Sequence, residues 1–360
     1  MFPPHTQRPF IIAEIGTSHG GSLSKAREMV DAAREAGAEC VKFQIVYADE
    51  ILHPNTGEVA LPGGNIRLYD RFKALERPPD FFAAIKEHAC SQGLAFLCTP
   101  FGIRSARELR ALNPFALKIA SPELNHEPLL REAASYGLPV YLSTGVSRLG
   151  DIEEALSLLK GVPVCLLHCV TSYPAPPEEY NLTLINSLRG IFGVPVGVSD
   201  HSLDPELVPA LAASLGAAAV EKHFCLSQDD PGLDDPIALP PALFARMVRS
   251  VRQAAGLSVE EVRPDLAGRW GAQMLDAVLG DGVKRLARSE AAHYGRTNRS
   301  LHALWELPPG TVLEAGMVSP LRTEKNLRPG LPPSWLSRIT GWQVKTLIPS
   351  GEGIRLEDFF

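Results

Sequence analysis

The sequence of 360 residues predicts an α/β fold, a closed (β/α)8 or TIM barrel followed by a smaller β-rich module. Two observations carry this prediction. Short runs that are apolar on both faces alternate eight times with amphipathic helical patterns, as in a parallel sheet covered on both sides. No GxGxxG sequence opens a helix, which disfavours an open dinucleotide-binding sheet.

The chain begins with strands predicted at 10–16 and 40–46, separated by a helix over 22–37 that a glycine ends. Residues 47–66 contain several glycines, prolines and asparagines, and we expect a long loop near the site. A helix over 69–93 should break at the adjacent Pro78 and Pro79, because proline interrupts the hydrogen bonds of a helix interior.

From residue 94 the alternation is regular. Strands are predicted at 94–100, 116–121, 139–145, 162–169, 194–201 and 217–224. Helices are predicted at 103–112, 127–136, 149–159, 182–192, 205–215 and 241–255. The barrel is therefore predicted to span residues 1–256, followed by a helical connector over 257–295 and the β-rich module over 296–360.

The composition limits the location and the partners. With 45% hydrophobic residues the chain can bury a large core, and its net charge of −6 gives no basic surface for nucleic acid. The six cysteines include no CxxC pair, so we expect buried free thiols. Neither a signal core nor a membrane-length apolar run is present, which predicts a cytoplasmic protein without a membrane partner.

Two stretches suggest the chemistry of the site, VGVSDHS at 196–202 and VEKHF at 220–224. Side chains alternate along a strand, so Ser199 shares a face with His201, and Glu221 shares one with His223. Adjacent parallel strands would bring both imidazoles to one pocket mouth. They could hold a divalent ion of the Mn²⁺ type with carboxylates and waters, or they could be two hydrogen-bonded histidines under loops.

Nearly every predicted strand ends in a polar side chain. A buried ammonium is costly without a partner, so Lys42 and Lys118 near the core call for an explanation. With neighbouring hydroxyls they could cradle a phosphate and a carboxylate. Alternatively, they pair with Glu14, Glu123 or Glu221 inside the barrel. The hydroxyls are those of Thr99, Ser121, Ser143 and Ser199.

The assembled motifs resemble the N-acetylneuraminate (sialic acid) synthase family, and they run through nearly the whole barrel in order. They are AEIGTSHGG (13–21), GAECVKFQ (37–44), TPF (99–101), KIASPELNH (118–126), LSTG (142–145), LLHCVTSYPAP (166–176), GVSDHS (197–202) and EKHF (221–224). The C-terminal module resembles the antifreeze-like SAF domain of these synthases, with NRSL (298–301) and RPG (328–330).

The resemblance implies a transferase that condenses phosphoenolpyruvate with the open-chain aldehyde of an N-acylated amino sugar, giving a nonulosonic acid and phosphate. His201 and His223 would hold the metal, Mn²⁺ first, with Mg²⁺ or Co²⁺ as alternatives. Asp234 is kept from a family loop and counts among the catalytic residues. The implied phosphoenolpyruvate contacts are Lys42, Thr99, Lys118, Ser121, Ser143 and Ser199.

The remaining implied roles concern the sugar and the assembly. Glu14 matches a catalytic carboxylate near the developing cationic carbon, and Gln44, Glu123 and Tyr173 match positions that line the sugar and metal region. Arg299 matches an arginine that reaches the partner subunit's site and binds the N-acyl group. A domain-swapped homodimer follows from that match.

Three departures from the family pattern fall towards the sugar, at Ser18, Asp235 and Asn298. They motivate the hypothesis that the acceptor is not plain N-acetylmannosamine, and a diacetamido-dideoxy sugar is one candidate. Two rival functions remain open. One is a synthase of octulosonate or heptulosonate phosphates, which would lack the C-terminal module. The other is a barrel that binds a nonulosonic acid or its precursor without converting it.

Overall fold

Eight parallel strands form the centre of the protein. The structure, a computed structural model, describes residues 8–61, 64–324 and 326–360. The strands are β1 (Phe10–Gly16), β2 (Cys40–Ile45), β5 (Ala95–Pro100), β6 (Leu117–Ile119), β7 (Val140–Ser143), β8 (Val164–His168), β9 (Val196–Asp200) and β10 (Ala219–His223). The hydrogen-bonded order is β5-β2-β1-β10-β9-β8-β7-β6, and β5 also contacts β6. The sheet therefore closes on itself, and the predicted (β/α)8 barrel is confirmed.

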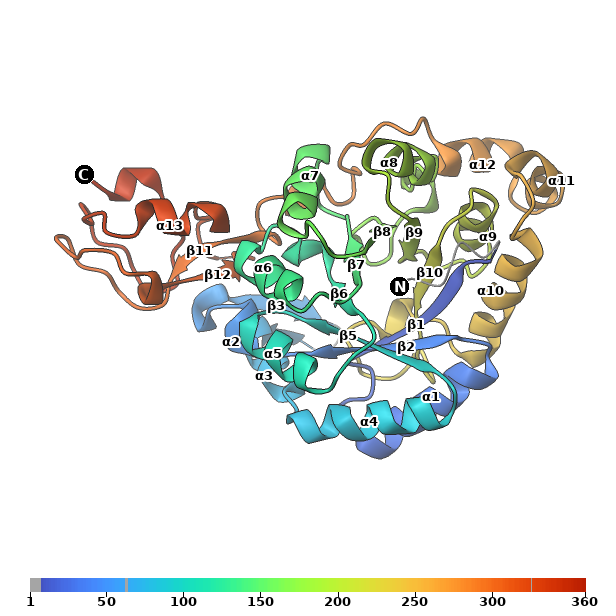
Figure 1. Ribbon diagram of the computed structural model, residues 1–360, viewed down its shortest axis with the longest axis horizontal. Coiled ribbons are helices and arrows are strands. Elements are labelled where there is room, and N and C mark those ends of the chain that lie inside the picture. Colours follow the sequence, from blue (N-terminus) through green and yellow to red (C-terminus); the bar gives the residue numbers. More distant parts are fainter. Residues whose placement is uncertain (1–7, 62–63, 325) are drawn as a thin grey trace.

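Helices cover the outside of this barrel (Figure 1). They are α1 (Leu23–Glu35), α4 (Pro79–Ser91), α5 (Ile103–Ala111), α6 (Glu127–Ser135), α7 (Leu149–Leu158), α8 (Leu184–Phe192), α9 (Leu207–Ser214) and α10 (Pro241–Ala254). The expected break at Pro78 and Pro79 is confirmed, since α3 (Leu68–Leu75) ends before it and α4 starts at Pro79. Proline suits the first turn of a helix because its missing N–H would be unpaired there.

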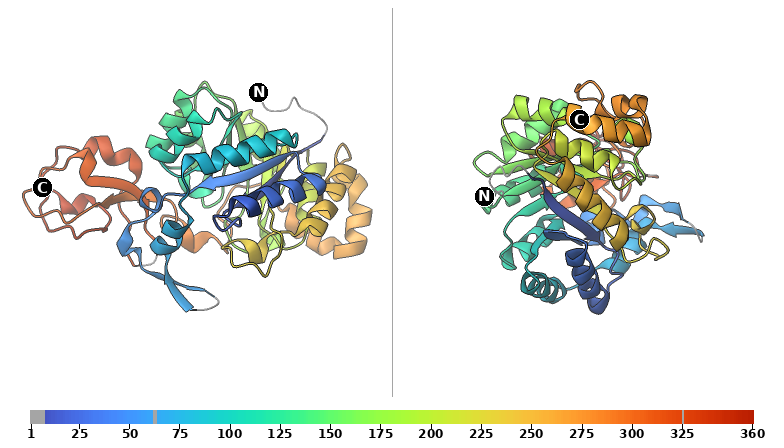
Figure 2. Two further views of the ribbon diagram at one scale, coloured as in Figure 1. Left: turned by 90° about the horizontal axis from the view of Figure 1, so that it is seen from below. Right: turned by 90° about the vertical axis from the view of Figure 1, so that its right-hand side faces the viewer.

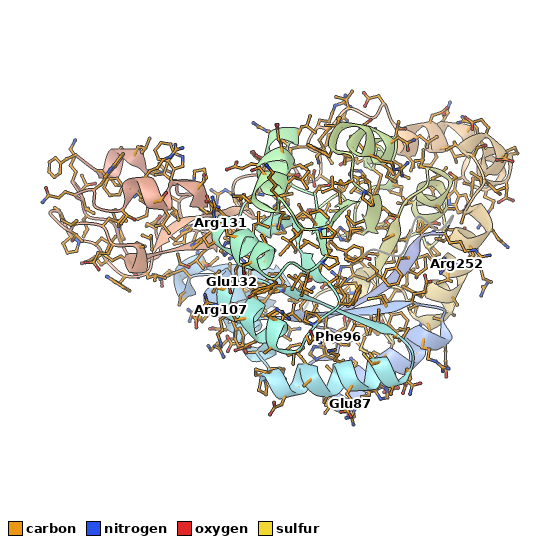
Figure 3. All side chains as sticks on the ribbon, viewed as in Figure 1. Glu87, Phe96, Arg107, Arg131, Glu132 and Arg252 are labelled. Carbon is orange, nitrogen blue, oxygen red and sulfur yellow. The ribbon has the colours of Figure 1, made fainter. Side chains whose placement is uncertain are left out.

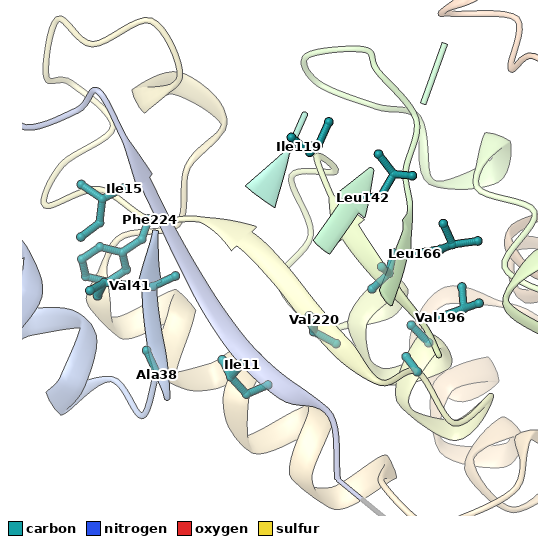
Figure 4. Close-up of a cluster of buried hydrophobic side chains, with 14 of the residues drawn as sticks. Ile11, Ile15, Ala38, Val41, Ile119, Leu142, Leu166, Val196, Val220 and Phe224 are labelled. Atoms are coloured by element: carbon teal, nitrogen blue, oxygen red, sulfur yellow. The ribbon is translucent and has the colours of Figure 1, made fainter. Parts of the chain in front are cut away.

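Alternation along the strands creates two apolar layers. One face packs against the helices through residues such as Leu142, Leu166, Val196 and Val220 on successive strands (Figure 4). The other face fills the base of the barrel with a separate cluster: Ile12, Cys40, Leu97, Ala116, Tyr141, Cys165, Leu167 and Ala219. Neighbouring helices are also linked at the surface, where Arg107 of α5 pairs with Glu132 of α6 at 2.9 Å (Figure 3).

The base of the barrel is closely packed at Gly197 of β9. A Cβ atom at this position would lie 2.4 Å from the carbonyl oxygen of Ala219 on β10. Glycine is therefore required for the two strands that carry the histidines to approach each other so closely.

The prediction of a structureless loop over 47–66 was wrong for most of that segment. It contains the short helix α2 (Ala48–Ile51) and a hairpin of β3 (Glu58–Leu61) with β4 (Gly64–Arg67), in which Glu58 pairs with Arg67. The hairpin projects from the barrel (Figure 2). Its strands are only four residues long, too short for a clear alternating pattern. Residues 62–63 of the expected loop lie outside the described residues.

Two helices, α11 (Val259–Trp270) and α12 (Ala272–Leu279), follow the barrel, and an extended segment leads on from them. Beyond it, β11 (Arg299–Ala303) and β12 (Val318–Arg322) pair antiparallel beside a second hydrophobic core that includes Leu301, Val344 and Ile354. This part stands off one side of the barrel (Figure 2). The exact domain limits given above stay a prediction.

Two expectations from composition can be compared with the structure. All six cysteines are free, and only Cys90 is exposed, so the expected buried thiols are found at the other five positions. In the described part of the chain, no helix is both long and apolar enough to cross a membrane.

Candidate active site

A cavity of about 230 Å³ opens at the carboxyl ends of the barrel strands, where barrels of this type carry their chemistry. Every predicted site residue except Glu123 and Arg299 lines it. Strand alternation explains this, because the face that fills the base of the barrel also carries the polar residues at its mouth. The predicted residues in the lining are Glu14, Lys42, Gln44, Thr99, Lys118, Ser121, Ser143, Tyr173, Ser199, His201, His223 and Asp234.

Lys42 lies between two carboxylates. Its Nζ is 3.2 Å from Glu14 Oε2 and 3.2 Å from Glu221 Oε2, and all three side chains are buried. Burial opposes the charge of Lys42, but the two carboxylates outweigh burial and raise its pKa. Lys42 therefore pairs with carboxylates inside the barrel, which was one of the two alternatives for the lysines. Glu221, which is not among the predicted site residues, belongs to the cavity wall.

The charge of Lys118 is less fully balanced by carboxylates than the charge of Lys42. Its Nζ donates a 2.7 Å hydrogen bond to Ser143 Oγ, and it stands 3.9 Å from Glu221 Oε1. Burial lowers the pKa of Lys118 to about 8, against the attraction of Glu221. An ammonium in this state gains from any anion that enters the cavity.

Hydroxyls and open acceptors surround the two lysines. Ser199 Oγ donates to Glu221 Oε1 at 2.8 Å, and Ser121 Oγ accepts from the Gly145 N–H at 3.0 Å. Thr99 Oγ1 is buried and has no hydrogen-bond partner among the described residues. Because buried polar atoms are nearly always paired, an orphaned hydroxyl beside two ammoniums points to a polar ligand.

The two imidazoles line the same cavity, with ring centroids 5.6 Å apart, and His201 Nε2 lies 3.4 Å from Ser199 Oγ. His201 Nδ1 donates to the Val170 carbonyl oxygen at 2.8 Å, which leaves Nε2 unprotonated near the hydroxyl of Tyr173. Burial and the neighbouring His223 lower the pKa of His201 to about 3, and burial also lowers the pKa of His223. Both rings are therefore neutral at physiological pH, the state that binds metals.

These histidines fit a divalent cation that takes two nitrogen ligands from the protein. Asp234 Oδ2 lies 3.9 Å from His223 Nδ1, too far for a hydrogen bond but close enough to act on the same ligand. Within the described ranges, no group of three or more His, Cys, Asp or Glu side chains is placed to hold a metal. Water and substrate oxygens would complete the coordination.

Two carboxylates, Glu14 and Asp234, also line the cavity. Gln44 Nε2 donates to Glu14 Oε1 at 2.6 Å, which orients Glu14 beneath the mouth. Burial, reinforced by Asp235, raises the pKa of Asp234 to about 6. Tyr173 stacks on His201 with ring centroids 4.4 Å apart. A carboxyl that titrates near neutrality beside a tyrosine and two imidazoles can accept and return a proton.

Arg299 differs from its predicted role. Its side chain is completely buried in its own chain, where it donates to Glu123 Oε1 at 2.9 Å and to the Phe101 carbonyl oxygen at 2.8 Å. Glu123 is equally buried, so neither side chain lines the cavity. The guanidinium at the mouth belongs to Arg322 of β12, 2.7 Å from Glu123 Oε1. Direct contact of Arg299 and Glu123 with a sugar is not supported by these positions.

The lining also includes side chains that we had not predicted: Thr17, Phe72, Phe101, Thr171, Leu233, Thr297 and Arg322. Glu221 was detectable from its alternation with His223. No local pattern marked Arg322, which reaches the mouth only because the C-terminal module packs there. His19 is buried outside the lining and accepts from the Gly21 N–H.

The fold and the site together define a class of protein, a (β/α)8 barrel whose mouth holds two ammoniums, several hydroxyls and two neutral imidazoles. Comparison with known proteins then identifies the family within this class. The model of the NeuB family matches residues 29–262, and the chain belongs to this family.

Several relatives match over almost their whole length. The N,N'-diacetyllegionaminic acid synthase of Legionella pneumophila is 32% identical over 95% of this chain and 92% of that protein. The pseudaminic acid synthase of Campylobacter jejuni (serotype O:23/36) is 31% identical over 98% of this chain and 97% of its own. The family resemblance read from the motifs is thus confirmed.

Solved structures of similar proteins support the same family assignment. The spore coat polysaccharide biosynthesis protein spsE of Bacillus subtilis superposes with a TM-score of 0.82 at 31% identity, covering 98% of this chain and 95% of that one. The N-acetylneuraminic acid synthetase of Leptospira borgpetersenii gives a TM-score of 0.64 at 31% identity, covering 74% and 94%. A heptulosonate phosphate synthase of Thermotoga maritima, at 15% identity, shares the fold alone.

Proposed function

We propose that this protein condenses phosphoenolpyruvate with the aldehyde of an N-acylated amino sugar and releases a nonulosonic acid and phosphate. One observation carries the proposal. A single cavity brings together Lys42, Lys118 and their hydroxyls, an anion-binding group, and the neutral His201 and His223. Relatives named as synthases of legionaminic and pseudaminic acid support the same reaction class.

The reaction balances as an addition followed by an elimination. Carbon 3 of phosphoenolpyruvate attacks the aldehyde carbon, and the new carbon–carbon bond leaves positive charge at carbon 2. Water adds to carbon 2, and the carbon–oxygen bond to phosphate breaks. The water proton goes to a base at the mouth and the aldehyde oxygen gains a proton, so the products are one sugar acid and one phosphate.

The chain's own residues have separable roles in these steps. Lys118, with Ser143 and the other hydroxyls, would hold the phosphate and carboxylate, since charge-assisted hydrogen bonds favour both. Glu14 lies within the cavity to stabilise the charge at carbon 2, and Asp234 exchanges the proton at the aldehyde side. A divalent cation on His201 and His223, Mn²⁺ first and Mg²⁺ or Co²⁺ as alternatives, would supply positive charge to polarise the aldehyde oxygen.

The acceptor is proposed to differ from plain N-acetylmannosamine. The three departures, Ser18, Asp235 and Asn298, do not line the cavity themselves, but each adjoins a residue that does, namely Thr17, Asp234 and Thr297. The human N-acetylneuraminate-9-phosphate synthase is 27% identical, below the legionaminic and pseudaminic acid synthases. Both observations support a diacetamido sugar as the acceptor.

Two further proposals concern assembly and the rivals. A domain-swapped homodimer would place the partner's C-terminal module where Arg322 and Arg299 now meet Glu123, and light scattering on the purified protein measures its mass.

A heptulosonate-type synthase is disfavoured, because relatives matching the whole chain, C-terminal module included, are named for nonulosonic acids.

The test is phosphate release from phosphoenolpyruvate, measured with no acceptor, with N-acetylmannosamine and with a diacetamido sugar. We expect release only with an acceptor, fastest with the diacetamido sugar, abolished by EDTA and restored by MnCl₂. A protein that binds sugars without releasing phosphate would be the non-catalytic rival. Highest efficiency with N-acetylmannosamine would overturn the acceptor proposal alone.

A further inference from the structure

A second cleft, of about 670 Å³, lies on the helix-facing side of β8. Its walls are the end of β8 from His168 to Val170, the segment 178–181, and the extended segment from Lys284 to Arg288 that follows α12. His168 alternates with Leu167 of the barrel base, so it faces away from the barrel interior. The volume falls within the range of small-molecule sites in proteins.

Two cations in this cleft, Lys284 and Arg288, form no ion pair among the described residues, although Glu290 of the same wall attracts Lys284. Lys284 Nζ donates to the Thr144 carbonyl oxygen at 3.0 Å, and no carboxylate in the described chain lies within ion-pair distance of it. Arg288 is exposed and likewise forms no ion pair there. Arg285, between them, is paired with Asp281 at 2.7 Å. Burial lowers the pKa of Lys284, as expected for an ammonium that is only weakly compensated.

The nearby carboxylates are partly used by backbone groups. Glu290 Oε2 accepts from the N–H groups of Val146 at 3.0 Å and Thr171 at 2.8 Å. Glu179 Oε2 accepts from the Ser289 N–H at 2.9 Å. Glu178 also lines the cleft, and neither it nor Glu179 or Glu290 forms an ion pair with Lys284 or Arg288 among the described residues. Both cations therefore keep donors free for a ligand that carries an anionic group.

His168 adds an unpaired acceptor. Its side chain is buried, and Nε2 donates to the Tyr180 carbonyl oxygen, so Nδ1 carries the lone pair. Nδ1 has no hydrogen-bond partner among the residues that the structure describes. A hydroxyl or amide N–H of a ligand would satisfy this atom, which a simple inorganic anion without a proton cannot do.

The cleft is joined to the barrel mouth through His201. Val170, in the cleft wall, accepts from His201 Nδ1 at 2.8 Å, and the Tyr180 hydroxyl accepts from the His201 backbone N–H at 2.6 Å. Cys169 Sγ lies 3.1 Å from Ser121 Oγ of the mouth. A displacement of these wall residues would therefore move groups in the candidate active site.

We propose that this cleft is a second ligand site, for an anionic and hydroxylated small molecule, and that its occupancy alters the position of His201. The oxyanion binds Lys284 and Arg288, and a hydroxyl or amide donates to His168 Nδ1. The anion is the carboxylate of a sugar acid or the phosphate of a sugar phosphate. The effect on turnover rests on the proposed function, whereas binding does not.

Calorimetric titration of the full chain tests binding with two probes, N-acetylneuraminate and glucosamine 6-phosphate, and the tighter probe identifies the anion. Lys118→Met weakens anion binding at the mouth, and this variant should still bind the probe in the second cleft with unchanged affinity. The double variant Lys284→Gln/Arg288→Gln should bind at least tenfold more weakly. Arg285→Gln, whose side chain is already paired, is the matched control and should stay within about twofold.

Thermal unfolding checks each variant, and Arg288→Gln alone, at an exposed position, carries the test if the double variant does not fold. The proposal is overturned if neither probe binds the wild type at millimolar concentration, if Lys118→Met abolishes binding, or if the double variant binds unchanged. The coupling is measured by ¹⁵N NMR of the His201 ring in Lys118→Met, which should shift on titration; an unmoved resonance contradicts it. Loss of phosphate release would instead overturn the proposed function and leave these binding results intact.

Discussion

The Lys118 ammonium and the Ser143 hydroxyl lie 2.7 Å apart on the neighbouring strands β6 and β7. Both side chains are buried, and both face the cavity at the barrel mouth. Lys42 is already held between two carboxylates. The ammonium of Lys118 is therefore the cation of the site that is most available to bind an anion. The first two predictions follow from it.

Lys118→Met should weaken phosphoenolpyruvate binding while leaving the fold intact, since a methionine of similar length replaces an ammonium that is costly to bury. A charge-assisted hydrogen bond contributes about 1.5–3 kcal/mol. The KM for phosphoenolpyruvate should therefore rise roughly 10- to 100-fold. Steady-state kinetics measure this. The control is Lys160→Met, at an exposed position at the end of α7, which should leave the KM unchanged.

The pH profile offers a second test of Lys118. Its pKa is lowered to about 8, so the ammonium loses its proton as the pH rises through that value. The kcat/KM for phosphoenolpyruvate should then fall about tenfold per pH unit above pH 8. Lys118→Arg keeps its charge and should shift this fall to higher pH. A wild-type profile that is flat to pH 9.5, or an identical fall in Lys118→Arg, would contradict the assignment.

A separate prediction concerns the two histidines of the cavity, His201 and His223. His223→Ala should lose bound metal and turnover together, because it leaves His201 as the single histidine that lines the cavity among the described residues. Metal content after dialysis against MnCl₂ and phosphate release give the two readouts, and the unfolding temperature checks the fold. His293→Ala, an exposed histidine, is the control. Turnover that survives in His223→Ala would remove the metal role from this histidine.

Substitution of the two arginines that pair with Glu123 should have different effects, one on stability and the other on substrate binding. Arg299→Met leaves Glu123 short of a buried partner, and breaking such a pair costs about 3–5 kcal/mol, so denaturant unfolding should show a large loss of stability. Arg322→Met acts at the mouth and should mainly raise the KM for the sugar, with less loss of stability. The opposite pattern, with the sugar KM changed only in Arg299→Met, would restore the role first expected of Arg299.

Strand alternation explains why so much of the site was predictable. Once a strand is located and its buried residues are known, period two fixes which side chains reach the mouth, and this placed Lys42, Ser143 and His201 correctly. The same rule puts Glu221 on the face of His223, and the sequence left open which carboxylate pairs with Lys42; the distances to Glu14 and Glu221 decide it.

Other features depend on contacts between distant parts of the chain. Arg322 reaches the cavity, and Arg299 is enclosed against Glu123, because β11 and β12 pack beside the barrel mouth. No pattern within a strand carries that information. The β3–β4 hairpin was missed for a related reason, since its short strands are bounded by glycines and polar residues that also occur in loops.

The central claim is that phosphoenolpyruvate and an amino sugar are joined with cleavage of the bond between carbon 2 and the bridging oxygen. Phosphoenolpyruvate labelled with ¹³C at carbon 3 and ¹⁸O at that oxygen tests it directly by mass spectrometry and NMR. The account predicts ¹³C bonded to the former aldehyde carbon in a sugar acid, with ¹⁸O in an equal amount of phosphate. Unlabelled phosphate, or ¹³C recovered as pyruvate with the sugar unchanged, would contradict it.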